Sequence, residues 1–158
     1  MGFYVRRDFI KVAKIISLIG LILLAFFSGY LTGKVKFNEA SREIRIGYDN
    51  LENIGQIDIK KVITDTENQR IVDNFLMIYL HKEQISNINV NLDKPNVHIS
   101  VINPKESTGL ISSRLWFTNE GAIIGVRSGE SWDQVKYFEI NIDKANYIKE
   151  QIGYQEEL

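Results

Sequence analysis

The run of residues 15–33 contains no charged side chain, and this feature constrains the chain more than any other. An α-helix needs about 20 apolar residues to cross the hydrocarbon core of a bilayer, so we expect a transmembrane helix over residues 15–33. The alternative is a cleaved signal peptide whose apolar region spans residues 15–27. Its cleavage site would need small residues, but Phe26, Phe27 or Leu31 lies three positions before each candidate site.

Basic residues around the apolar run predict its orientation. Before it stand Arg6, Arg7, Lys11 and Lys14 with a single acid, Asp8. Lys and Arg close to a membrane helix tend to remain in the cytoplasm. We therefore expect residues 1–14 to be a cytoplasmic tail and the C-terminal domain of this single-pass cell-membrane protein to be extracytoplasmic. The lipid bilayer would surround residues 15–33.

Composition limits what the rest of the chain can be. After the apolar run the chain is long enough for one domain, and that part holds more acidic than basic residues. Because nucleic acids require a basic surface, we expect no nucleic-acid partner. The chain has no Cys, which excludes disulfides and a Cys-linked lipid. An extracytoplasmic domain without disulfides is typical of bacterial envelope proteins.

The segment between the membrane helix and the domain has two interpretations. Apolar residues recur every three or four positions from Phe37 to Ile54, which favours an amphipathic juxtamembrane helix or linker over residues 34–56. The alternating residues Ile44, Ile46 and Tyr48 would also suit a strand.

Residues 57–153 predict an extracytoplasmic α+β domain. A capping box from Thr64 to Glu67 predicts the start of a helix, and Asp143 and Gly153 suit the two ends of a closing helix. Period-two alternation predicts strands, including a hairpin of residues 88–92 and 97–101. The expected fold is a transmembrane helix followed by one antiparallel sheet of four to five strands with helices packed on it. Residues 154–158 should form a frayed tail.

Residue types that carry catalysis are sparse. The chain has two His and no Cys, and it lacks paired-His metal spacing, a Ser-His-Asp order and a Gly-rich phosphate loop. We therefore expect no catalytic residue, no metal site, no cofactor and no enzymatic activity. His81 suits a helix end, and His98 suits the polar face of a strand.

One face of the predicted sheet is the candidate interaction site. If the apolar residues of each strand point to the core, alternation places five others on the opposite face: His98, Arg114, Trp116, Tyr137 and Glu139. Such side chains are typical of protein-binding surfaces. The alternative is that the juxtamembrane helix covers this face and Trp116 belongs to a second layer of core. Trp132, in a polar loop, either contacts a partner or folds back onto the sheet.

A second candidate contact lies in the membrane helix. Ala25, Gly29 and Gly33 are spaced by four residues, which would place small side chains on one helix face where a second helix can approach closely. With the apolar stripe of residues 37–54 continuing as a short coiled stalk, this spacing suggests a homodimer.

Several stretches carry a family resemblance: Asp58-Ile59-Lys60-Lys61-Val62-Ile63, the helix ending at Ile78, the turn Asp93-Lys94-Pro95-Asn96, Arg114-Leu115-Trp116-Phe117 before Glu120-Gly121, and Trp132 with Tyr137-Phe138 before the closing helix. Over about residues 57–152 the chain resembles small extracytoplasmic domains of low-GC Gram-positive envelope proteins related to the YhfM-like lipoproteins. The resemblance implies the α+β order and an envelope location, and it implies no activity. Here a membrane helix replaces any lipid anchor.

These observations predict a non-enzymatic, membrane-anchored protein-interaction module of a bacterial envelope, with an envelope protein as its partner. The alternative is an oligomeric assembly subunit of a secretion or conjugation machine, which requires stable self-association. A hydrolase of envelope polymers would instead require a deep pocket lined by carboxylates.

Overall fold

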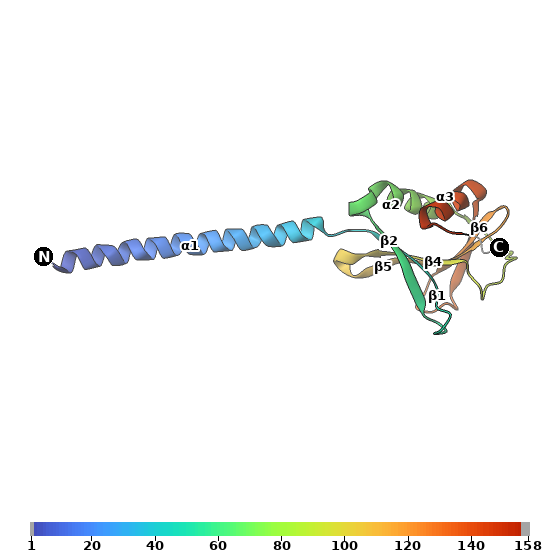
Figure 1. The fold of residues 1–158 in the computed structure, drawn as a ribbon, viewed down its shortest axis with the longest axis horizontal. Helices are drawn as coiled ribbons and strands as arrows, with labels where there is room; N and C mark the ends of the chain where they lie inside the picture. The colour runs from blue at the N-terminus through green and yellow to red at the C-terminus, as the bar shows by residue number, and fades with distance from the viewer. Residues whose placement is uncertain (1, 156–158) are drawn as a thin grey trace. The chain divides into compact units, whose positions relative to one another are not determined.

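The computed structural model describes residues 2–155, in two units that divide between Glu39 and Ala40 (Figure 1). The first unit is one helix, α1 (Gly2–Asn38). Its segment Lys14–Gly33 is apolar and long enough to span a membrane, and none of that segment is buried by the residues that the structure describes. The helix predicted over residues 15–33 is therefore present, and α1 extends beyond it at both ends.

The second unit is a seven-stranded antiparallel sheet with two helices on one face (Figure 1). In order across the sheet, the strands are β2 (Ile57–Thr64), β1 (Glu43–Asp49), β4 (Val97–Asn103), β5 (Thr108–Phe117), β6 (Gly121–Arg127), β7 (Val135–Asn141) and β3 (Glu83–Gln84). The helices are α2 (Asp65–Leu80) and α3 (Ile142–Ile152), and a short 3-10 helix, η1 (Pro104–Glu106), joins β4 to β5. The predicted α+β class is confirmed, but the sheet has seven strands rather than four to five.

Apolar side chains from both helices and from one sheet face form the core. Phe75 of α2 and Ile148 of α3 are fully buried there, together with Ile99 of β4. The Tyr79 hydroxyl lies 2.6 Å from Ser113 Oγ, and that Ser113 hydroxyl donates to the Ile99 carbonyl at 2.8 Å. The buried polar groups of Tyr79 and Ser113 are thus satisfied. We call this side of the sheet the core face and the opposite side the outer face.

Short-range signals set the helix ends. Thr64 is the N-cap of α2, as predicted, and its side-chain oxygen accepts from the Glu67 N–H at 3.3 Å. Gly153 ends α3 in the left-handed conformation, with φ +68°, also as predicted. The N-cap of α3 is Asn141 rather than Asp143, because Asn141 Oδ1 accepts from the backbone N–H of Lys144 at 3.1 Å.

Residues 43–49 form strand β1, so the helix predicted over residues 34–56 is wrong beyond Asn38 and the strand interpretation is correct. β1 pairs with β2 on one side and with β4 on the other. Ile44 and Ile46 are fully buried on the core face. Pairing on both sides outweighs the helical spacing of the apolar residues, because tertiary contacts override weak local preference. The second unit consequently begins at Ala40 rather than at residue 57.

Residues 85–96 form an irregular connection, so the predicted strand over residues 88–92 is wrong. β4 pairs with β1 and β5, and β3 pairs with β7. Therefore no hairpin joins residues 88–92 to residues 97–101. We call residues 85–96 the cover loop, because the Asn91 carbonyl in it accepts a hydrogen bond from Trp116 Nε1 at 2.8 Å.

The tail predicted to fray from residue 154 begins with an ordered contact. The Tyr154 and Phe117 ring centroids are 4.7 Å apart, and the Tyr154 hydroxyl accepts from Asn96 Nδ2 at 2.9 Å. The prediction of fraying is therefore wrong at Tyr154. Residues 156–158 of the predicted tail lie outside the described residues.

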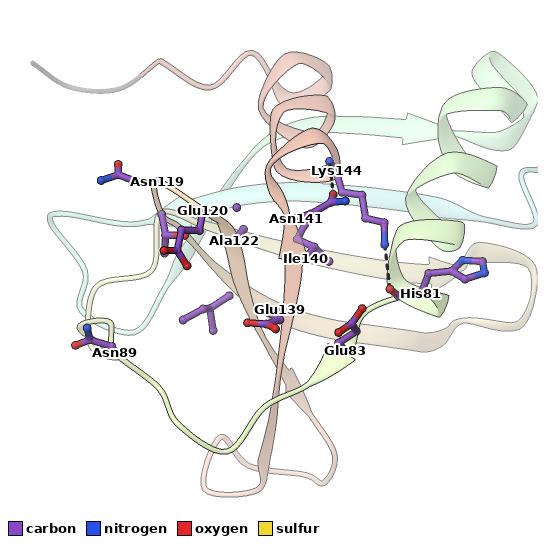
Figure 2. A pocket seen from close by; sticks show the side chains of 13 residues that line it. His81, Glu83, Asn89, Asn119, Glu120, Ala122, Glu139, Ile140, Asn141 and Lys144 are labelled. Atoms are coloured by element: carbon purple, nitrogen blue, oxygen red, sulfur yellow. Dashed lines mark hydrogen bonds between the residues drawn. The ribbon is translucent and has the colours of Figure 1, made fainter.

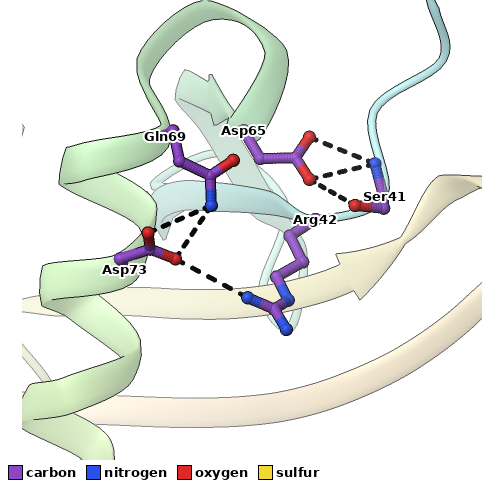
Figure 3. Close-up of polar contacts among 5 residues, drawn as sticks. All are labelled: Ser41, Arg42, Asp65, Gln69 and Asp73. Atoms are coloured by element: carbon purple, nitrogen blue, oxygen red, sulfur yellow. Dashed lines mark hydrogen bonds and ion pairs between the residues drawn. The ribbon is translucent and has the colours of Figure 1, made fainter.

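The start of the domain is fastened to α2 (Figure 3). The backbone N–H of Ser41 donates to both carboxylate oxygens of Asp65, at 3.1 and 3.2 Å, and the Ser41 hydroxyl donates to the same group. The Arg42 guanidinium lies 3.6 Å from the Asp73 carboxylate. Only residues 39–40 therefore separate the end of α1 from the first residue held by α2.

Candidate functional site

The sheet register places the five predicted interaction residues on the outer face. His98 is paired with Arg114 across β4 and β5, and the same row continues through β6 to Tyr137 of β7. In the next row, Trp116 is aligned with Glu139 through β6. The five residues share a face, as alternation predicts. That this face binds a partner stays a prediction.

Much of the outer face is covered by other parts of the domain. Trp116 is 4% exposed and His98 is 6% exposed. The Trp116 and Tyr137 ring centroids are 6.2 Å apart, and a Cβ at Gly125 would lie 3.1 Å from both rings. The expectation of an open face is therefore wrong for Trp116 and His98. The cover loop, rather than a juxtamembrane helix, contacts Trp116 through the Asn91 carbonyl, and the buried Trp116 ring lies beside Tyr137.

The loop between β6 and β7, residues 128–134, folds back onto the outer face. The Trp132 ring centroid lies 4.0 Å from the guanidinium carbon of Arg114 and 5.8 Å from that of Arg127, which are cation–π distances. Arg114 Nε is buried without a hydrogen-bond partner in the described part of the chain. Of the two interpretations of Trp132, the structure shows the one in which it folds back.

His98 is a buried titratable group of this face. Its Nε2 lies 2.7 Å from Asp49 Oδ1, whereas its Nδ1 has no hydrogen-bond partner among the described residues. Burial lowers the pKa of His98, because a buried imidazolium loses hydration; the hydrogen bond and charge of Asp49 raise that pKa, and the charge of Arg114 lowers it. Since burial is the largest effect, the neutral imidazole is favoured, with Nε2–H donating to Asp49.

The lowered pKa of His98 predicts that acid weakens the domain. Between this lowered pKa and the usual value near 6.5, the unfolded chain binds the proton more strongly, so the free energy of unfolding rises with pH. This contribution is present above about pH 6.5 and is lost as the pH falls through that window. Substituting His98→Gln should therefore reduce the loss of melting temperature between about pH 7.5 and about pH 5.5.

The second histidine of the chain supplies the control for this measurement. His81 is exposed at the end of α2, so His81→Gln should leave the wild-type pH dependence in place. Equal pH dependence in wild type and His98→Gln would show that His98 does not couple protonation to folding.

A cavity of about 600 Å³ lies beside the β5–β6 turn and β7 (Figure 2). Three glutamates line it, and two of them, Glu83 and Glu139, are directly paired across β3 and β7. All three carboxylates, including Glu120, are exposed. No group of three or more His, Asp or Glu suited to a metal occurs among the described residues.

An exposed apolar row on β2 was missed by sequence reasoning. Ile57, Ile59 and Val62 are 42%, 48% and 45% exposed and are paired with outer-face positions of β1. We call these three residues the β2 strip. Beside it lies a small hollow of about 70 Å³, which Ile57 and Ile59 line together with Arg45 and Trp132. The apolar run was visible in the sequence, but its place on an edge strand depends on strand order.

The predicted helix–helix contact lies within α1. Ala25, Gly29 and Gly33 are four residues apart in one continuous helix, so they lie on the same side of it. A Cβ at Gly29 or Gly33 would have open space around it. Association of two such helices stays a prediction.

Comparisons of the chain with protein-family models, with curated proteins and with solved structures find no match. The likeness to YhfM-like envelope domains therefore stays a prediction.

Proposed function

We propose that this chain is a single-pass membrane protein whose domain binds another protein outside the cytoplasm and catalyses no reaction. The apolar segment of α1 supports the anchor, because it has the length of a membrane span and no other part of residues 2–155 buries it. The basic residues that precede this segment support a cytoplasmic N-terminus. The partner would be another protein of a bacterial envelope.

The β2 strip is the observation that carries the binding part of this proposal. Exposed apolar side chains gathered in one place mark interaction sites. Full burial of each side chain contributes about 1.5–3 kcal/mol, and about half of the surface of each is still exposed, so the strip offers about 2–5 kcal/mol. A micromolar complex requires about 8 kcal/mol. The contact must therefore extend beyond the strip to neighbouring outer-face residues such as Arg45 and Trp132.

The backbone edge of β2 is a less suitable contact than its outer face. Lys60 and Lys61 stand in the middle of this edge strand, and lysines at such positions oppose pairing with foreign strands. Lys60 Nζ lies 3.6 Å from the Asp58 carboxylate, and Lys61 Nζ donates to the Gln151 carbonyl at 2.6 Å. We therefore assign the partner to the side chains of the strip rather than to the strand edge.

Site-specific photo-crosslinking in the native host tests this assignment. A photoreactive residue in place of Ile59 should yield a discrete crosslinked product in the membrane fraction, and Ile57→Asp in the same chain should abolish it. Met77 supplies the matched control, because it is an apolar residue of similar exposure, 51%, on α2. Identical products from positions 59 and 77, or no product from position 59, would contradict protein binding through the strip.

A further inference from the structure

The tip of the β1–β2 hairpin, residues 50–56, holds two apolar side chains entirely in solvent. Leu51 is 99% exposed and Ile54 is 102% exposed. These two values far exceed the exposures of the β2 strip, so the tip is a separate feature from that strip. Isolated exposed apolar residues are common, but two such residues on one short turn need a reason.

Hydrogen bonds hold the tip in a defined shape. Asn50 Oδ1 accepts from the backbone N–H groups of Glu52 and Asn53, at 2.8 and 2.7 Å, and Asn50 Nδ2 donates to Asp58 Oδ1 at 2.9 Å. The Asn50 N–H also donates to the Gln56 carbonyl at 2.9 Å. The turn is thus pre-organised around Asn50 while Leu51 and Ile54 make no contribution to the core.

The chain keeps this tip within reach of a bilayer that contains α1. Only residues 39–40 lie between the end of α1 and Ser41, which is bound to Asp65 of α2 (Figure 3). At 1.5 Å per helical residue and about 3.3–3.6 Å per extended residue, Ser41 lies within about 20 Å of Gly33. Between Ser41 and the tip, β1 is an extended strand of seven residues, so it spans about 20 Å at about 3.3 Å per residue. This length matches the greatest distance between Ser41 and Gly33, so the tip reaches the bilayer surface in orientations of the domain that point β1 toward it.

We propose that the hairpin tip inserts Leu51 and Ile54 into the surface of the bilayer that holds α1. This inference rests on the proposed membrane anchor. A convex tip with two protruding apolar side chains suits a fluid hydrocarbon boundary, which requires no complementary pocket, better than it suits a protein surface. The tether raises the effective concentration of the tip at the membrane, so a weak affinity suffices.

The charges of the tip predict which lipid headgroups it binds. Glu52 is the one charged residue of the tip, and the flanking Asp49 and Asp58 are also acidic. With no basic residue in the turn, anionic headgroups are not attracted to it. Insertion should therefore occur in uncharged phosphatidylcholine and should be insensitive to salt at about 1 M, where the screening length is about 3 Å.

Lipid-borne quenching of a fluorescent label on the full-length chain tests this inference. Because the chain has no Cys, Asn53→Cys creates a unique thiol on the tip, and the side chain it replaces makes no hydrogen bond in the described structure. In phosphatidylcholine vesicles that contain spin-labelled lipid, the label at position 53 should lose most of its fluorescence. A label at Asn119→Cys, on the exposed β5–β6 turn, should lose little. The double substitution Leu51→Ser, Ile54→Ser should restore the fluorescence at position 53 to the level at position 119.

A third label separates failure of this inference from failure of the anchor. Leu24→Cys lies within the apolar segment of α1, so lipid quenching there reports membrane insertion of that helix. Quenching at position 24 without quenching at position 53 would overturn tip insertion and leave the anchor intact. No quenching at either position would overturn both. Unchanged quenching at position 53 after the double substitution would also overturn the inference, because the quenching would then not depend on Leu51 and Ile54.

Discussion

Replacing Trp116 by Ala should lower the free energy of unfolding by about 3–5 kcal/mol, the usual cost of removing a buried indole. Trp116 is 4% exposed, packs against Tyr137 and donates its Nε1–H to the Asn91 carbonyl at 2.8 Å. Alanine would leave a cavity under the cover loop and would remove the donor from that carbonyl. Urea unfolding of the full chain in detergent micelles, followed by near-UV circular dichroism, measures this loss.

Trp132→Ala is the control for this substitution. The Trp132 ring is only partly buried and contacts the guanidinium groups of Arg114 and Arg127, so its removal should cost about 1 kcal/mol. If Trp116→Ala cost no more than Trp132→Ala, Trp116 would be acting as a surface residue. The candidate face would then have to be treated as open to a partner.

Features decided by short-range interactions were predictable from the sequence. The capping box identified Thr64 because its hydroxyl needs only the N–H three residues later. Gly153 was identifiable because a left-handed residue after a helix favours glycine. Similarly, period-two alternation placed Arg114 and Trp116 on one face, because alternation depends on the strand alone.

Features decided by distant segments were not predictable in the same way. Ile44 and Ile46 fit a strand or a helix, and their burial between β2 and β4 decides the outcome. The burial of the candidate face was not predictable either, because nothing in the sequence of its strands indicates that the cover loop contacts Trp116. The exposure of the β2 strip likewise follows from the position of β2 at the edge of the sheet.

Replacing Gly121 by Ala should lower the free energy of unfolding by about 3 kcal/mol, from backbone strain together with steric overlap. Gly121 has φ +153°, and a Cβ there would lie 2.0 Å from the Ile140 carbonyl oxygen. That oxygen is a backbone atom of β7, so it cannot move aside as the end of a flexible side chain could. The turn between β5 and β6 must therefore open. Opening it strains two backbone hydrogen bonds, from the Thr118 N–H to the Gly121 carbonyl at 2.9 Å and from the Gly121 N–H to the Thr118 carbonyl at 3.4 Å.

The same change at Gly109 of β5 separates steric overlap from the general effect of replacing glycine. Nothing lies within 4 Å of a Cβ built at Gly109, so Gly109→Ala should change the free energy of unfolding by no more than about 0.5 kcal/mol. Gly121 is also paired with Asn141, the N-cap of α3, so displacement of the turn should weaken the start of that helix. Thermal unfolding of both variants, with amide exchange at Lys144 as a local measurement, tests this connection. Equal stability of the two variants would show that β6 and β7 can separate locally without cost to the core.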